Sequence, residues 1–267
     1  MPELPEVETT IRYLTSKVKE KKIISISKSQ KKLRKNLNFK DLESISQRKI
    51  ISVKRFAKYI VIRLDNDNYL IVHLGMSGRL KFYLNENYKK EKHDHVVLQF
   101  DKFKIVFNDP RRFGMFFRLE DINEVEIFFN NYGTDLLVNK IKIKEIYNKF
   151  ITKKVSLKQA LLNQSLIVGI GNIYANEALF HSRLSPLRLT NSLNLAELTQ
   201  LISSCKFVLK LSLKNGGSSI NDYKSPDGTL GSFQSLFKVY QKEHVIYKKK
   251  SYKICLLYTS PSPRDRI

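Results

Sequence analysis

The chain has 267 residues, 42% of them hydrophobic, which is enough to bury the core of one large domain or two smaller ones and excludes a disordered chain. Its 48 Lys and Arg residues outnumber 25 Asp and Glu residues, and the formal net charge of +23 favours nucleic acid as partner, although an AT-rich genome also enriches lysine. An apolar window of about 18 residues and a secretory leader are both missing, and two cysteines cannot build a disulfide framework, so we expect an unanchored protein in the reducing cytoplasm.

An amphipathic helix is predicted at the start of the chain. Apolar residues recur there every third or fourth position, namely Leu4, Val7, Ile11, Leu14 and Val18. Pro2 and Pro5 lie where a helix tolerates proline.

Segments rich in β-branched and aromatic residues follow. They predict strands at 56–64, 69–74, 80–84, 95–100, 104–107 and 115–119. The polar run 65–68 separates two of them as a turn. Because no helical pattern intervenes, the strands predict an antiparallel sandwich or barrel.

The second half of the chain is predicted to be helical. From about residue 121 the apolar period lengthens to about 3.6 residues, which predicts helices at 122–132, 143–150, 156–164, 173–180 and 195–214. The predicted fold class is α+β, with an N-terminal helix and a β lobe followed by a helical lobe. A cleft between two lobes would suit a long ligand.

The first residues suggest chemistry as well as structure. If Met1 is removed, Pro2 presents a secondary amine whose pKa near ~8 leaves more of it unprotonated at neutral pH than a lysine with a pKa near ~10.4. At a helix N-terminus, where the dipole disfavours an ammonium, such an amine can attack a sugar carbon and form a Schiff base. On spacing alone, an ordinary helix start is the alternative.

The string PELPEVE, which begins at Pro2, resembles the N-terminal signature of the formamidopyrimidine-DNA glycosylase family. The resemblance implies that Pro2 is the nucleophile, that Glu3 moves protons during opening of the sugar ring, and that Glu6 takes part in base recognition. The basic segment 54–59 is similar to the family's hairpin with a DNA-contacting lysine, which makes Lys58 the proton donor for β-elimination. A basic edge strand that faces solvent is the alternative for this segment.

Two glycine-containing turns, 73–78 and 109–114, carry large side chains. When an enzyme flips a base out of the DNA stack, such side chains can fill the gap. The resemblance assigns this role to Met76, Arg111 and Phe113, with Arg111 facing the cytosine opposite the lesion. Packing in the core is the alternative for Met76 and Phe113.

Further DNA contacts follow from the resemblance. His93 and His95 point to the same side of a strand, but no third ligand of matching spacing is evident, so we predict no metal site and take His93 as a DNA contact. The segment 166–175 is similar to the family's helix-two-turns-helix motif, in which Asn172 grips the DNA backbone; Lys153 matches a second contact, with a register uncertain by one residue. The loop that closes over the extruded base is predicted to contain Ser218, Ser219 and Tyr223.

The end of the chain departs from the resemblance. The family ends in a zinc ribbon of two Cys-x-x-Cys pairs, but the first pair falls at Tyr247 and Lys250, which cannot hold zinc, so no cofactor is expected. Residues 255–267, Cys255 included, resemble a translated sequencing adapter, and we expect a non-native tail and weak DNA binding; a native ribbon without zinc is the alternative. The predicted domains are a catalytic β-sandwich at 1–120, a helix-two-turns-helix domain at 121–225, a ribbon remnant at 226–254 and the tail at 255–267.

The resemblance extends from Pro2 to Ile254 and predicts a base-excision-repair enzyme. It implies a DNA glycosylase and apurinic or apyrimidinic site lyase that removes 8-oxoguanine and formamidopyrimidines, acting as a monomer on damaged duplex DNA. An endonuclease VIII-like enzyme for oxidised pyrimidines fits the N-terminal and void-filling residues less well. A non-catalytic DNA-binding protein has no use for the free amine, and a membrane-surface protein would need a basic amphipathic helix with aromatic anchors.

Overall fold

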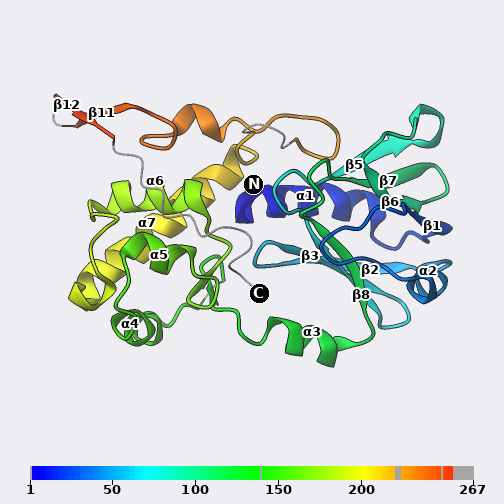
Figure 1. Ribbon diagram of the computed structural model, residues 1–267, viewed down its shortest axis with the longest axis horizontal. Helices are drawn as coiled ribbons and strands as arrows, with labels where there is room; N and C mark the ends of the chain where they lie inside the picture. The colour runs from blue at the N-terminus through cyan, green and yellow to red at the C-terminus, as the bar shows by residue number, and fades with distance from the viewer. Residues whose placement is uncertain (1, 139, 220–223, 248, 255–267) are drawn as a thin grey trace. The chain divides into compact units, whose positions relative to one another are not determined.

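The computed structural model describes residues 2–138, 140–219, 224–247 and 249–254 (Figure 1). The chain divides into two compact units that are interleaved in sequence. The first contains the described residues up to 130 and residues 213–234, and the second contains the described parts of 131–212 and of the chain from 235 onward. The predicted domains, 1–120 and 121–225, are by contrast uninterrupted segments of the chain. The helix after residue 121 belongs to the first unit, where Phe128 and Phe129 pack against the ring of Tyr59.

The first unit contains two antiparallel four-stranded sheets, with strand orders β1-β6-β7-β5 and β2-β3-β4-β8. Its elements are α1 (Leu4–Val18), β1 (Ser25–Lys28), α2 (Phe39–Ile45), β2 (Ile50–Phe56), β3 (Tyr59–Leu64), β4 (Tyr69–His73), β5 (Arg79–Leu84), the 3-10 helix η1 (Asn85–Asn87), β6 (Asp94–Gln99), β7 (Phe103–Asn108), β8 (Met115–Leu119) and α3 (Ile122–Phe129). Side chains from both sheets and from α1 share one apolar core. The predicted antiparallel sandwich is therefore confirmed.

Helix α1 forms as its apolar spacing predicts. The five residues of the pattern are all buried, and the helix packs against β2 and β3. Glu6 occupies the first turn and Lys17 the last, which is the order that the helix dipole favours.

Parts of the first unit differ from the prediction. The predicted strand 56–64 corresponds to β3, which begins only at Tyr59, because Ala57 has a φ of +51° and begins a two-residue turn between Phe56 and Tyr59, which pair across β2 and β3. Strand β1, helix α2 and all of β2 before Phe56 were not predicted. Helix α2 does carry a local signal, since the side chains of Asn38 and Asp41 form a reciprocal capping box.

The second unit is mainly helical. It contains β9 (Thr134–Asp135), α4 (Ile143–Ile151), α5 (Leu157–Leu162), β10 (Ile167–Val168), α6 (Asn172–Ser182), the 3-10 helix η2 (Thr190–Ser192), most of α7 (Leu195–Lys214), part of the 3-10 helix η3 (Phe233–Leu236), and the strands β11 (His244–Tyr247) and β12 (Lys250–Lys253). Together with α3 of the first unit, helices α4 to α7 confirm the five helices predicted for the second half of the chain, with small differences at their ends. Among the described residues, none of the helices has the length and apolar character needed to span a bilayer.

Strands β11 and β12 form an antiparallel hairpin near the end of the described chain. The segment that precedes it is held by Glu177 of α6, a buried residue whose carboxylate accepts hydrogen bonds from the backbone N–H groups of Lys238, Val239 and Tyr240 at 2.8, 2.9 and 2.7 Å. The predicted tail at 255–267, with Cys255, lies outside the described residues.

Candidate active site

The N-terminal end of α1 buries two carboxylates beside Pro2. Glu3 is 2% exposed and Glu6 is 1% exposed, and Pro2 is itself buried. The backbone N–H of Glu3 donates to Oε2 of Glu6 at 2.9 Å. Because the positive end of the helix dipole lies here, an ammonium at Pro2 is disfavoured by the helix while the nearby carboxylates are stabilised by it.

Glu6 also connects α1 to the loop at 216–219. Its Oε1 accepts hydrogen bonds from the N–H of Ser218 at 2.8 Å and from the Ser218 hydroxyl at 2.9 Å. Gly217 permits this approach, since its φ is +81° and a Cβ there would lie 3.1 Å from the same oxygen. The structure thus brings together Glu6 and Ser218, two residues predicted to recognise the base.

The other residues predicted for base recognition lie beyond this contact. The hydroxyl of Ser219 accepts from the N–H of Gly231 at 2.7 Å, and the Ser219 N–H donates to Oε1 of Gln234 at 3.0 Å. Tyr223 lies outside the described residues.

Lys58 occupies the turn between β2 and β3 rather than the start of a strand, and only 6% of it is exposed. The turn is tied to α1 by Arg55, whose Nε lies 3.0 Å from Oε2 of Glu8 and whose guanidinium also donates to the carbonyl of Ala57 at 3.3 Å. Glu8 belongs to α1, whose N-cap is Glu3, the residue that directly follows Pro2. The two predicted catalytic regions are therefore joined by a defined chain of contacts.

His73 is a residue of this site that sequence reasoning missed. Burial, and then the nearby cations Lys58 and Arg34, lower the pKa of His73 to about 3, so its ring is neutral at physiological pH. Its Nδ1 accepts a hydrogen bond from the backbone N–H of Gly75 at 3.0 Å, which places the ring proton on Nε2. His73 precedes the turn that carries Met76, so a sequence signal was present, but its proximity to Lys58 depends on the pairing of β3 with β4.

Three residues predicted to fill the DNA gap lie on two neighbouring loops. Met76 is half-buried, whereas Arg111 and Phe113 are exposed, and the Arg111 guanidinium lies 5.0 Å from the centre of the Phe113 ring. Phe113 is 40% exposed, so packing in the core does not account for it. His93 is half-buried, and its backbone carbonyl accepts from the N–H of Asp109.

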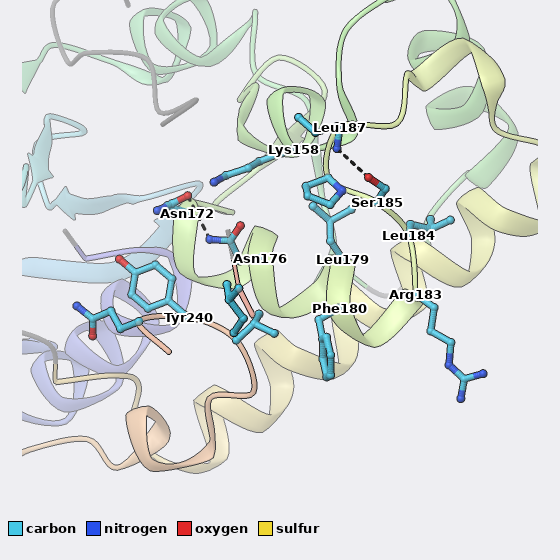
Figure 2. Close-up of a pocket in the computed structure, with 14 residues that line it drawn as sticks. Lys158, Asn172, Asn176, Leu179, Phe180, Arg183, Leu184, Ser185, Leu187 and Tyr240 are labelled. Carbon is cyan, nitrogen blue, oxygen red and sulfur yellow. Dashed lines mark hydrogen bonds between the residues drawn. The ribbon is translucent and has the colours of Figure 1, made fainter. Parts of the chain in front are cut away.

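The predicted DNA contacts of the second unit lie on separate elements. Lys153 is exposed just after α4, and Asn172 is the first residue of α6. Asn172 borders a cavity of about 660 Å³. Figure 2 shows the side chain of Lys158, which also lines this cavity, extending toward Asn172. The Nδ2 of Asn176 lies 3.4 Å from the Oδ1 of Asn172.

The hairpin β11–β12 does not fit the zinc that the resemblance implies. Tyr247 and Lys250, the positions of the first cysteine pair, are register partners across its turn. A phenol and an ammonium are not zinc ligands of structural sites. Within the described residues, no group of three or more His, Cys, Asp or Glu side chains could hold a metal ion.

Sequence profiles of two domains match this chain. The formamidopyrimidine-DNA glycosylase N-terminal domain matches residues 1–116, and the formamidopyrimidine-DNA glycosylase H2TH domain matches residues 132–224. Both profiles lie where the sandwich and the helices are observed.

Relatives and solved structures agree with these profiles. The chain is 40% identical over 257 residues to a formamidopyrimidine-DNA glycosylase of Wolbachia sp. subsp. Brugia malayi, covering 96% of this chain and 92% of the relative, and 42% identical over 245 residues to one of Zymomonas mobilis, covering 91% and 90%. It is similar to wild-type Lactococcus lactis Fpg in complex with N7-benzyl-Fapy-dG DNA, with a TM-score of 0.84 and 28% identity over 95% of this chain and 98% of that one. The protein is a DNA-binding glycosylase that belongs to the formamidopyrimidine-DNA glycosylase family.

Proposed function

We propose that this enzyme removes oxidised purines, such as 8-oxoguanine and formamidopyrimidines, from duplex DNA and then cleaves the strand at the resulting abasic site. The observation that carries the proposal is the arrangement at the start of α1: buried Glu3 follows Pro2, and Glu8 and Arg55 tie this helix to the turn of Lys58. The solved Lactococcus lactis Fpg complexes contain Fapy-dG DNA or abasic-site-analogue DNA, which supports the same substrate class here.

Pro2 acts as the nucleophile once Met1 is removed. Its secondary amine, with a pKa near ~8, bonds to C1′ of the deoxyribose, and the bond from C1′ to the base breaks as the base leaves with the bonding electrons. The amine loses one proton in this step and the departing base gains one, so the base leaves as a neutral molecule. Glu3 assists the opening of the sugar ring, in which the C1′–O4′ bond breaks and O4′ gains a proton, leaving an iminium between Pro2 and C1′.

Strand cleavage follows from the iminium. It acidifies the protons of C2′, and loss of one of them expels the 3′ phosphate by β-elimination. Lys58 donates the proton that the departing phosphate oxygen needs. The nearby ring of His73, whose pKa is lowered to about 3, is neutral and adds no second positive charge there.

Met76, Arg111 and Phe113 fill the gap left by the base, while His93 and Lys153 contact the DNA and Asn172 contacts its backbone. The net charge of +23 supports this mode of binding, because phosphate neutralisation releases counterions. We further propose that the enzyme acts as a monomer on the DNA of the bacterial cytoplasm, and without a zinc ion.

Borohydride trapping tests the proposal. A duplex with one 8-oxoguanine opposite cytosine should form a covalent adduct with the parent enzyme when the iminium is reduced, and Pro2→Gly should abolish the adduct. A duplex with an oxidised pyrimidine should react more slowly. A Pro2→Gly protein that forms the adduct as well as the parent does would rule out the proposed nucleophile.

A further inference from the structure

The two loops that carry Met76, Arg111 and Phe113 touch through their backbones. A Cβ added to Gly75, whose φ is +62°, would lie 2.6 Å from the backbone N of Gly114, and one added to Gly114 would lie 2.9 Å from the carbonyl oxygen of His73. Side chains do not fit at either position. The loops 74–78 and 109–114 therefore meet at a fixed distance.

A buried carboxylate holds the two loops together. Oδ1 of Asp109 accepts a hydrogen bond from the hydroxyl of Ser77 at 2.6 Å and from the N–H of Arg111 at 3.2 Å, and Oδ2 accepts from the N–H of Gly114 at 2.8 Å. Asp109 is 0% exposed and Ser77 is 3% exposed. Hydrogen bonds to a charged acceptor are stronger than neutral ones, and a buried donor that loses its partner is costly.

The backbone of Asp109 is held by His93 and His95. The backbone N–H of Asp109 donates to the carbonyl of His93 at 3.0 Å, and Nε2 of His95 donates to the carbonyl of Asp109 at 2.9 Å. His95 is buried and its Nδ1 lies 3.0 Å from the hydroxyl of Ser29. The two histidines that could suggest a metal site thus fix the position of Asp109.

We propose that Asp109 and Ser77 are positioning residues that make the two loops one rigid wedge for insertion into DNA. The inference rests on the proposed function, because it takes Met76, Arg111 and Phe113 as the residues that enter the gap. All three side chains must enter together, and a loop ordered in advance avoids an entropy cost at each insertion. Since the backbone N–H of Arg111 donates to Oδ1 of Asp109, discrimination of the base opposite the lesion also depends on this carboxylate.

The test compares two substrates that differ in their need for the wedge. Excision of 8-oxoguanine from a duplex requires the gap to be filled, whereas Schiff-base formation on a single-stranded oligonucleotide with a ready-made abasic site does not. Asp109→Asn keeps the size of the side chain but replaces one acceptor oxygen with a donor. Because misplacement by about 1 Å can cost about 100-fold in rate, we expect single-turnover excision to fall by about 100-fold, while borohydride trapping on the single strand stays within about 2-fold of the parent.

A second variant and a second readout guard against a simple folding defect. Ser77→Ala removes the hydrogen bond that the hydroxyl donates to Asp109 and the one that it accepts from the N–H of Arg111, and it should slow excision by about 10-fold. In both variants the preference for 8-oxoguanine opposite cytosine over 8-oxoguanine opposite adenine should shrink, which a general loss of stability would not cause. Asp101→Asn, the same change at an exposed turn between β6 and β7, is the matched control and should match the parent.

Three results would contradict the positioning role of Asp109 and Ser77: an unchanged excision rate in both variants, an equal fall in reaction on both substrates, or an unaltered preference for the opposite base. If the parent enzyme neither excises 8-oxoguanine nor forms an adduct with the abasic strand, the proposed function is wrong, and so is the positioning role that rests on it.

Discussion

The start of α1 and the C-terminal hairpin hold their polar groups in different ways. At the helix start, Glu6 is buried and both of its oxygens accept hydrogen bonds, from α1 itself and from the 216–219 loop. Along β12 every side chain is exposed, and Glu177 accepts hydrogen bonds from the backbone of the segment that precedes the hairpin. Both regions use one buried carboxylate, but only the first surrounds it with candidate catalytic residues.

We expect the two regions to serve different steps, with chemistry at the helix start and binding of duplex DNA at the hairpin. A site enclosed by buried hydrogen bonds is ordered before the substrate arrives, which favours catalysis. An exposed, lysine-containing hairpin would attract DNA phosphates through its charge, an interaction that salt screens. Changes at the two carboxylates should therefore affect different steps.

The largest effect is expected for Glu6→Gln. The amide places a donor against the donors of Glu3 or Ser218, so the unfolding free energy should fall by about 3 kcal/mol, and excision of 8-oxoguanine by about 100-fold as the start of α1 moves. Urea unfolding and single-turnover assays measure the two quantities. Glu126→Gln, an exposed residue of α3, serves as control. Parent-like excision by Glu6→Gln would show that this contact does not organise the site.

A smaller and different effect is expected for Glu177→Gln. Loss of one acceptor for the N–H groups of 238–240 should loosen the hairpin and weaken binding to duplex DNA by about 10-fold, measured by fluorescence anisotropy. Borohydride trapping on a single-stranded abasic oligonucleotide should stay within about 2-fold of the parent. Glu243→Gln, exposed beside β11, is the control. If trapping falls as far as binding does, the proposed separation of chemistry and grip is wrong.

Acid should weaken the first unit through His73. The folded protein has a His73 pKa of about 3 against 6.5 for the unconstrained ring, so between these values the unfolded chain binds a proton that the folded chain does not, and stability is lost as pH falls. At pH ~4.5 this loss should reach about 3 kcal/mol. His73→Asn keeps an acceptor for the N–H of Gly75 and should lose less stability between pH ~7 and pH ~4.5, as urea midpoints would report. Equal losses in parent and variant would assign the acid sensitivity to other groups.

The smallest effect is expected for zinc removal. Because Tyr247 and Lys250 stand where cysteine ligands are required, purified protein should contain sub-stoichiometric zinc by atomic absorption, and a chelator should leave its melting temperature unchanged. A stoichiometric metal that is lost together with stability would mean that other ligands replace the cysteines.

The sequence predicts what local patterns encode. Apolar spacing locates α1, and α7 begins and ends at the predicted residues. The turn at Ala57 was missed because neither of its two residues is a usual turn former, although Ala57 adopts a positive φ. The role of Lys58 as proton donor could be predicted only through the family resemblance.

The site depends more on contacts between distant residues. Ser77 and Asp109 are 32 positions apart and Glu6 and Ser218 are 212 apart, so no local pattern reveals either contact. Met76, Arg111 and Phe113 could be proposed from the resemblance, but the carboxylate that joins their loops could not. Sequence reasoning thus proposes the groups that act, and the structure adds the groups that hold them in place.

Mass spectrometry of the borohydride-trapped adduct identifies the residue that bonds to the deoxyribose. After proteolysis, the mass of the reduced deoxyribose remnant should lie on a peptide that begins at Pro2, with Met1 absent. A remnant on a lysine peptide, or an enzyme that keeps Met1 and reacts at full rate, would contradict the account.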